Sequence, residues 1–165
     1  MSTPQTVARV TRQLTETGGR TAQDLGLGRI VGQILVHLYL SPAECSLDDL
    51  ARELGLSKAA VSIASRQLES LGLLRRSWKQ GDRKTYYRTA DDIATALHQG
   101  LLMLVRNKMA LLATELKQAE DELGKTETDA RATFVLGRVR RAQKLRNTAM
   151  AVLESPIVKL LTRVR

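Results

Sequence analysis

Residues 46–89 of this chain have the order of two short helices followed by a basic hairpin: SLDDLARELGLSKAAVSIASRQLESLGLLRRSWKQGDRKTYYRT. Ser46 is predicted to cap the first helix, because a hydroxyl can accept hydrogen bonds from the free N–H groups there. Gly55 is predicted to end that helix in the left-handed conformation, and Ser57 to cap the second. The connection of about three residues forces the helices to cross steeply, as in a helix-turn-helix.

The second helix is expected to run over residues 58–71 and to have two different faces. Its inner face carries apolar residues at steps of three and four: Val61, Ala64, Leu68 and Leu71. The side chains on its outer face are short near the N-terminus and long and polar further along the helix. This arrangement suits a helix that approaches base edges in a major groove. We therefore predict base reading or flanking contacts from Lys58, Ser62, Arg66 and Gln67. The same recognition helix is predicted to place Ser57 on phosphate and Ala59 and Ile63 on the DNA-facing side.

Residues 74–89 are expected to form a β-hairpin, or wing. Gln80-Gly81-Asp82 is a turn signal, and β-forming residues follow it. Arg83 at the tip is predicted to lie in or over the minor groove, where negative potential is concentrated. Asp82 is predicted to pair with a nearby arginine and hold the tip in shape. The wing residues predicted to contact phosphate or minor groove are Lys79, Arg83, Lys84 and Arg88.

Each part alone is also compatible with an ordinary structural role. The two helices could pack as a hairpin on a core, and the tip could be a solvated turn. Together, in this order and spacing, the parts favour double-stranded DNA as the partner. The aromatic content of 3% argues against recognition of single strands by base stacking.

The stretch resembles the MarR superfamily of bacterial transcription regulators, and it looks closest to the GbsR-like branch. The resemblance rests on SLDDLARELGLSKAAVSIASRQLESLGLL, on the wing WKQGDRKTYYRT, and on the preceding helix GRIVGQILVHLYLSP, and it covers about residues 27–89. It implies a homodimer on a palindromic operator, often a repressor that a small ligand or a stress signal releases.

The remainder of the chain is expected to be helical. Before the motif we predict an amphipathic helix over residues 4–17 that Gly18 and Gly19 end, one extra turn over residues 21–25, a buried helix over residues 28–40, and a short strand at residues 44–46. After it, Asp91 and Asp92 are predicted to cap a helix that Gly124 ends. A turn over residues 124–128, a helix from Asp129 to about Glu154 and a last short helix over residues 157–164 are predicted to follow.

The helix that ends before Gly124 carries an apolar stripe at an average step near 3.6: Ala94, Leu97, Leu101, Val105, Met109, Leu112, Leu116, Ala119 and Leu123. A rod of that length, roughly 45–50 Å, must pack on a partner helix or subunit. The fold class we predict is mainly α with a small β wing, a winged helix-turn-helix domain plus long helices that form a dimerisation region. The predicted division is an N-terminal dimerisation helix (1–27), the DNA-binding domain (28–90) and the long-helix dimerisation region (91–165).

The formal net charge of +9 indicates a polyanionic partner. Residues 46–90 carry nine basic and five acidic residues, whereas residues 134–165 carry eight basic and one acidic. The C-terminal charge either touches phosphate or balances the acidic helix before it, and the second interpretation is favoured because a charge run on a helix is usually solvated. An architectural DNA-binding protein with little sequence preference is the alternative function.

An enzyme is not predicted. His37 and His98 lack a second ligand at metal spacing, so neither a metal site nor a cofactor is expected. A lone cysteine without a cation fixed beside it by the sequence is more often structural than a redox sensor, and we interpret Cys45 in this way. The lone cysteine and the absence of an apolar N-terminal segment or membrane span suggest a cytoplasmic protein. A cleft between the winged domain and the long dimerisation helices is a natural pocket for a small-molecule effector, with Tyr39, Trp78, Met103 and Met109 as candidate lining.

Overall fold

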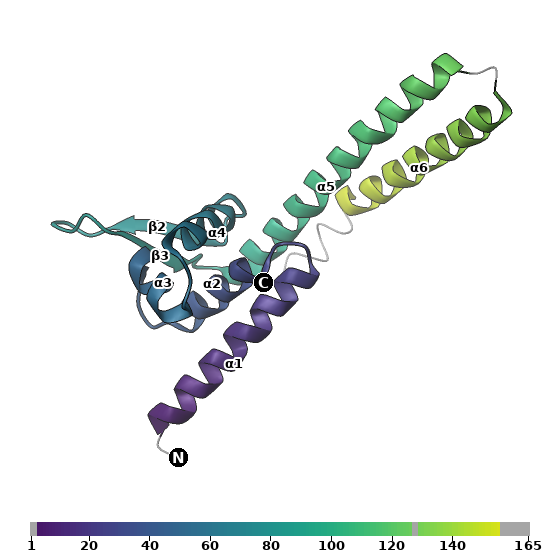
Figure 1. Ribbon diagram of the computed structural model, residues 1–165. Helices are drawn as coiled ribbons and strands as arrows, with labels where there is room; N and C mark the ends of the chain where they lie inside the picture. The colour runs from purple at the N-terminus through teal and green to yellow at the C-terminus, as the bar shows by residue number, and fades with distance from the viewer. Residues whose placement is uncertain (1–2, 127–128, 156–165) are drawn as a thin grey trace. The chain divides into compact units, whose positions relative to one another are not determined.

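The computed structural model describes residues 3–126 and 129–155, and it contains helices and one small sheet (Figure 1). The elements are α1 (Thr3–Asp24), α2 (Arg29–Leu40), β1 (Cys45–Ser46), α3 (Leu47–Leu54), α4 (Lys58–Ser70), β2 (Leu74–Trp78), β3 (Thr85–Thr89), α5 (Ile93–Leu123), a 3-10 turn (Gly124–Thr126) and α6 (Ala130–Glu154). The chain forms two compact units, Met1–Gly100 and Leu101–Arg165. The predicted division at residues 27 and 90, which separates the chain by expected role, stays a prediction.

The helices α1 and α2 approach each other closely at glycines. A Cβ atom at Gly18 would lie 2.3 Å from Cγ2 of Val36, and one at Gly32 would lie 2.1 Å from the carbonyl oxygen of Gly18. The prediction that Gly18 and Gly19 end a first helix is therefore wrong. Glycine costs a helix about 0.5–1 kcal/mol relative to alanine, and here its missing side chain allows backbone contact with α2 and lets α1 continue to Asp24.

The two short helices of the motif form as predicted. Oγ of Ser46 accepts a hydrogen bond from the backbone N–H of Asp49 at 3.1 Å, and Oγ of Ser57 accepts one from the N–H of Ala60 at 3.2 Å. Gly55 ends α3 with φ 64°, a left-handed conformation that a residue without Cβ adopts at little cost. These caps fix where α4 begins, and so which of its residues face outward.

The core of the first unit lies between α2, α3, α4 and the sheet. Its buried residues include Val31, Ile34, Leu38, Leu50, Val61, Ala64, Leu68, Leu73, Leu74 and Tyr87. The predicted helix over residues 28–40 is α2, and the inner face predicted for the second helix is buried. Because that inner face fills the core, the opposite face of α4 is left on the surface.

The sheet is antiparallel with strand order β1-β3-β2. The β2–β3 hairpin pairs Leu74 with Thr89 at its base and Trp78 with Thr85 near its tip. The short strand expected at residues 44–46 is β1, whose Cys45 lies opposite Tyr87. In Figure 1 the hairpin extends beyond α3 and α4, as a wing does.

The second unit contains most of α5 and the whole of α6, which lie side by side as a helical hairpin (Figure 1). Asp92 accepts from the N–H of Thr95 at 3.0 Å and Asp129 from the N–H of Arg131 at 3.1 Å, so the caps predicted at these two residues are confirmed. Asp91, which was predicted to cap the same helix as Asp92, pairs instead with Arg88 and Arg75. Much of the predicted apolar stripe of α5 is exposed, including Leu101 and Leu112. The helix predicted over residues 157–164 lies outside the described residues.

Candidate nucleic-acid interface

The outward face of α4 presents most of the residues predicted for the recognition helix. Lys58, Ala59 and Arg66 are exposed, as is the cap residue Ser57, while Ser62 and Gln67 are half-buried. Ile63 is an apolar residue with 61% of its surface exposed. The first two turns of this face therefore combine small residues with one large apolar side chain, and a guanidinium follows one turn later.

Two of the polar residues on this face already have partners within the protein. Nζ of Lys58 forms an ion pair with a carboxylate oxygen of Asp48 at 2.8 Å. Nε2 of Gln67 donates to the backbone carbonyl of Leu27 at 3.3 Å. Gln67 thus ties α4 to the chain before α2, whereas Arg66 has no carboxylate partner among the described residues.

Asp82 organises the tip of the wing. Its Oδ2 accepts a hydrogen bond from the hydroxyl of Tyr86 at 2.6 Å, and its Oδ1 accepts one from the backbone N–H of Lys84 at 2.9 Å. The Tyr86 hydroxyl, with the Lys84 N–H, lowers the pKa of the Asp82 carboxyl. The prediction that Asp82 pairs with an arginine is wrong, because its partners within the described structure are a tyrosine and a backbone amide. Gly81 completes the turn with φ 82°.

The basic residues of the wing fall into two groups. Lys79, Arg83 and Lys84 are exposed around the tip; Nζ of Lys79 lies 4.1 Å from the centre of the Tyr86 ring. Arg88 lies at the other end of β3, where it pairs with Asp91 and with Glu44. The structure therefore brings three of the four predicted wing cations together and holds Arg88 apart, beside two carboxylates.

Sequence reasoning missed two wing residues. Tyr86 holds Asp82 and also carries Lys79 on its ring; the four-residue separation of Asp82 and Tyr86 across a tight turn is the signal that could have found it. Trp78, at the tip end of β2, has 67% of its surface exposed. An indole at that place offers a flat apolar surface beside the cationic tip.

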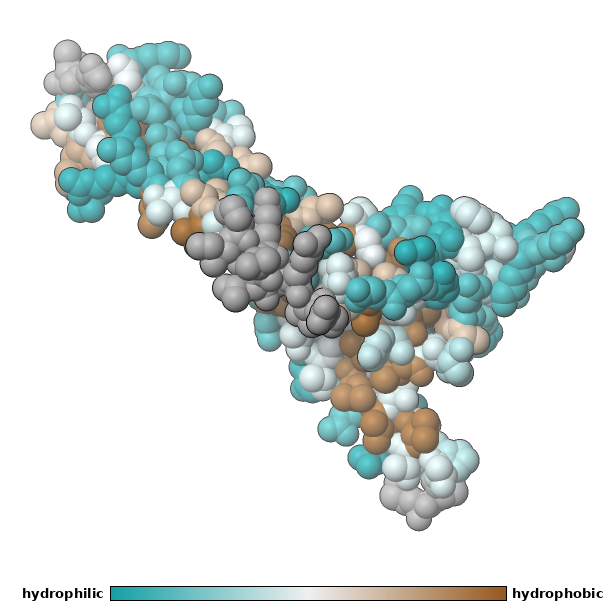
Figure 2. Space-filling model, turned by 180° about the vertical axis from the view of Figure 1, so that it is seen from behind, coloured by the Kyte–Doolittle hydropathy of each residue, from teal (hydrophilic) through white to brown (hydrophobic). Residues whose placement is uncertain are grey.

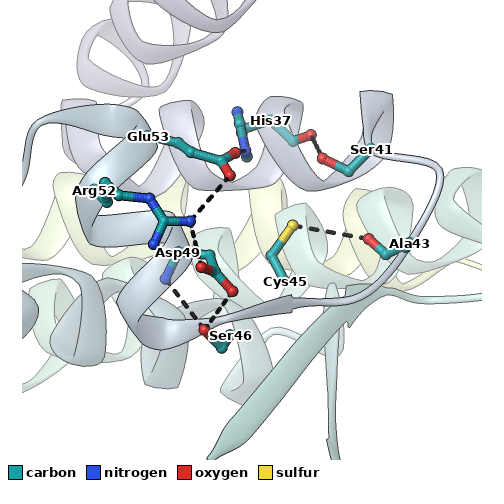
Figure 3. A network of polar contacts seen from close by, with 8 residues as sticks. All are labelled: His37, Ser41, Ala43, Cys45, Ser46, Asp49, Arg52 and Glu53. Atoms are coloured by element: carbon teal, nitrogen blue, oxygen red, sulfur yellow. Dashed lines mark hydrogen bonds and ion pairs between the residues drawn. The ribbon is translucent and has the colours of Figure 1, made fainter.

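A polar network joins α2 to the first helix of the motif (Figure 3). Nε2 of His37 lies 2.9 Å from Oε2 of Glu53, so His37 has a polar partner as well as a packing role. Arg52 forms an ion pair with Asp49, whose other oxygen accepts from Oγ of Ser46 at 2.6 Å. Burial raises the pKa of the Cys45 thiol, which lies 3.8 Å from the carbonyl oxygen of Ala43. Such a thiol is a weak nucleophile at neutral pH.

The four residues suggested as effector lining are not shown to meet. Tyr39 borders a groove of about 330 Å³ between the end of α2 and the residues after β3, with Ser41, Glu44 and Arg88. Trp78 lies on the wing, and Met103 and Met109 belong to the second unit. Among the described residues no cluster of histidine, cysteine or carboxylate side chains could hold a metal ion. No helix within the same ranges is long and apolar enough to cross a membrane.

Residues 25–84 match the model of the MarR family. A structure described as a transcriptional regulator is 23% identical and matches with TM-score 0.65, over 93% of this chain and 99% of its own. This likeness and the family match confirm the predicted winged helix-turn-helix fold. Over residues 25–84 the similarity is to this family's model, and over the rest of the chain it is a similarity of fold.

Two further structures are more distant. A MepR variant from S. aureus bound to an oligodeoxyribonucleotide is 16% identical, with TM-score 0.42 over 78% of this chain and 97% of that one. The transcriptional regulator BldR from Sulfolobus solfataricus is 21% identical, with TM-score 0.41 over 75% of this chain and 88% of that one. No curated protein matches the sequence.

Proposed function

We propose that this chain is a cytoplasmic, sequence-specific regulator of transcription that binds double-stranded DNA as a homodimer on a palindromic operator and represses until a small ligand releases it. The GbsR-like branch is part of the same proposal and is supported by the residues quoted above. The observation that carries the DNA-binding role is the pairing of an exposed α4 face with a cationic wing tip in one unit.

Electrostatics support this role. Arg66 on α4 and Arg83 at the wing tip have no carboxylate partner among the described residues, so both guanidinium groups are available to an external anion. Other cations of the motif, such as Arg76 with Glu69 and Arg88 with Asp91, are already neutralised. The available positive charge is therefore concentrated where a major-groove helix and a minor-groove wing would meet DNA.

The homodimer is supported by an apolar face of α1 that is exposed among the described residues. Val7, Val10 and Leu14 follow at steps of three and four, and all are exposed. Figure 2 shows the corresponding apolar band along α1, next to hydrophilic surface. A second copy of the chain is the occupant we propose, because a two-fold dimer would place two α4 helices about one DNA turn apart, ~34–36 Å.

The alternative, an architectural DNA-binding protein, is favoured by one observation on α6. Arg131, Arg138, Arg141 and Lys144 are exposed, and none has a carboxylate partner in the described part of the chain. The other interpretation of this charge, that it balances the acidic residues of α5, also has support, because Arg140 pairs with Glu120 of α5 at 2.8 Å. Phosphate binding by the four exposed cations would add affinity without sequence preference.

Selection of operator sites from random double-stranded DNA, followed by titration at several salt concentrations, separates the two functions. A regulator is expected to bind the selected site at least ~10³ times more tightly than random DNA at physiological salt. Arg66→Ala is expected to cost about 1–3 kcal/mol and to relax the sequence preference if this arginine reads a base. A selection that returns no shared sequence, with a ratio near one, would leave the architectural function standing in place of the regulator.

A further inference from the structure

The wing has two faces, and one of them turns toward α4. Side chains alternate between the faces of a strand, so Leu74, Arg76 and Trp78 of β2 share a face. Leu74 is buried in the core of the first unit, and the guanidinium of Arg76 lies 2.7 Å from a carboxylate oxygen of Glu69 in α4. The face that carries Trp78 is therefore the face that packs on α4.

The neighbouring strand contributes to the same face. Thr85 pairs with Trp78, and Tyr87 with Arg76, in the antiparallel register, and residues directly opposite each other lie on one face of a sheet. Burial raises the pKa of the Tyr87 hydroxyl, while the positive charges of Arg76 and Arg66 oppose this shift. Arg66 of α4 is thus close enough to act on this face of the hairpin.

Trp78 and Thr85 lie where this face leaves the core. Trp78 has 67% of its surface exposed, although tryptophan is highly buried on average. Thr85, directly opposite, is half-buried. In the described part of the chain, neither the indole N–H nor the threonine hydroxyl has a hydrogen-bond partner. One flat apolar surface and two donors thus remain unused by the fold.

The surroundings of this pair indicate what could use it. A cross-strand pair of β-forming residues alone would add a little stability and would need no partner. Here Lys79 follows Trp78 and Lys84 precedes Thr85, and both lysines are exposed. A surface that combines an indole, hydrogen-bond donors and cations matches a sugar–phosphate chain, which presents apolar C–H groups and anionic oxygens in turn.

We propose that Trp78 and Thr85 bind the sugar–phosphate strand that separates the major groove from the minor groove. This inference rests on the proposed DNA-binding function. With α4 in the major groove and the wing tip in the adjacent minor groove, the residues between them face the intervening strand. The indole of Trp78 lies against a deoxyribose, and the hydroxyl of Thr85 donates to a neighbouring phosphate. Contacts of this kind make up half or more of the hydrogen bonds between proteins and DNA.

Such a contact differs in its effects from those predicted for Arg66 and Lys84. It carries no sequence information, so its loss should weaken the selected operator and random duplex DNA by the same factor. It brings no charge to a phosphate, so the dependence of affinity on salt should stay as in the wild type. Loss of Arg66 should instead relax sequence preference, and loss of Lys84 should lower the salt slope.

Trp78 is the only tryptophan of the chain, so its fluorescence reports the contact without a label. Acrylamide should quench the wild type at least about twofold less efficiently when duplex operator is bound, because the exposed indole becomes covered. One strand of the operator alone should protect the indole less than the duplex does. Equal or stronger protection by the single strand would overturn the proposal, because it would indicate stacking on bases.

Gel-shift titrations of variants, at several salt concentrations, measure the energetic part. Trp78→Ala is expected to weaken binding of both the operator and random duplex DNA by roughly five- to tenfold. Thr85→Val keeps the branched shape and is expected to weaken both by roughly two- to threefold. Tyr39→Ala truncates an exposed aromatic residue outside the wing and should bind as the wild type does. Circular dichroism checks that each variant folds.

The outcomes separate this contact from DNA binding itself. A changed ratio of operator affinity to random-DNA affinity in Trp78→Ala would overturn the proposal, because the indole would then read sequence. Unchanged affinity of Trp78→Ala would also overturn it. So would operator binding by the wild type that leaves Trp78 as accessible to acrylamide as in the free protein, and the DNA-binding function would still stand. A wild type that binds no duplex DNA would overturn both.

Discussion

The carboxylate of Asp82 and the hydroxyl of Tyr86 are joined across the wing turn by a hydrogen bond of 2.6 Å. The hydrogen bond from Tyr86 is the largest influence on the pKa of Asp82, and it lowers that pKa, so the carboxylate stays charged at any pH at which DNA binding would be measured. Tyr86 also places its ring under Lys79. One side chain therefore fixes both the backbone of the tip and the direction of a wing cation.

Tyr86→Phe is expected to weaken operator binding several-fold, because the tip loses a constraint while every cation remains. The dependence of affinity on salt should stay as in the wild type. Lys84→Ala, by contrast, is expected to lower the salt slope by about one unit if Lys84 contacts phosphate. Gel-shift titrations at several salt concentrations measure both quantities.

Tyr39→Phe is the matched control for the wing variant, since Tyr39 is exposed and lies outside the wing. Its operator affinity should equal that of the wild type. If Tyr86→Phe bound DNA as tightly as this control, the hydrogen bond to Asp82 would have no part in presenting the wing.

The exposed side chain of Ile63 predicts a particular base in the operator. An apolar side chain on a recognition helix gains by contact with the methyl group of thymine, which lines the major groove. Ala59, one turn earlier, is the only other apolar residue among those we predict for this DNA-facing side. We therefore expect each selected half-site to contain a thymine whose replacement by deoxyuridine, which lacks only that methyl, weakens binding.

A double-mutant cycle tests the assignment to Ile63. Ile63→Ala should bind the thymine operator more weakly than the wild type does, and should lose no further affinity when deoxyuridine replaces the thymine. Ser62→Ala, a neighbouring change on the same helix, should lose as much affinity on this replacement as the wild type loses. An equal loss of affinity in the wild type and Ile63→Ala would assign the thymine contact to another residue.

The glycine contacts between α1 and α2 predict opposite effects for two similar substitutions. Gly32→Ala would place a Cβ 2.1 Å from a backbone carbonyl oxygen, and backbone cannot move away cheaply. It is expected to lower the thermal midpoint and the free energy of unfolding. Gly137→Ala in α6 meets nothing within 4 Å, and should raise stability by about 0.5–1 kcal/mol.

Thermal and urea denaturation followed by circular dichroism measures both glycine variants. The two substitutions add the same methyl group to a helix interior, so the comparison isolates the contact with α1. Gly32→Ala as stable as the wild type would show that α1 and α2 do not pack at this distance in solution.

These glycines also show where sequence reasoning stops. The caps at Ser46, Ser57 and Asp92 could be predicted because a cap depends on residues within one turn of each other. Gly18 and Gly19 have the same local signal as a helix end, and their actual role depends on Gly32 and Val36 of another helix. The partner of Asp82 was missed for a different reason: Tyr86 lies only four residues away across the turn, and the prediction considered charge alone.

The same distinction applies to the candidate site. Which residues face outward on α4 followed from the apolar spacing of Val61, Ala64 and Leu68 and is confirmed by their burial. Which of these outward residues are free could not be predicted, because the partners of Lys58 and Gln67 lie outside α4.

Cys45 is predicted not to control DNA binding through oxidation. Burial raises the pKa of its thiol, and hydrogen peroxide reacts with the thiolate, so the reactive fraction at neutral pH is smaller than for an ordinary cysteine. Operator affinity should be the same before and after treatment of the wild type with peroxide, and Cys45→Ser should bind DNA as the wild type does. Thiol labelling before and after treatment reports the oxidation state directly. Loss of operator binding in the treated wild type, with full binding retained by treated Cys45→Ser, would make this cysteine a redox sensor.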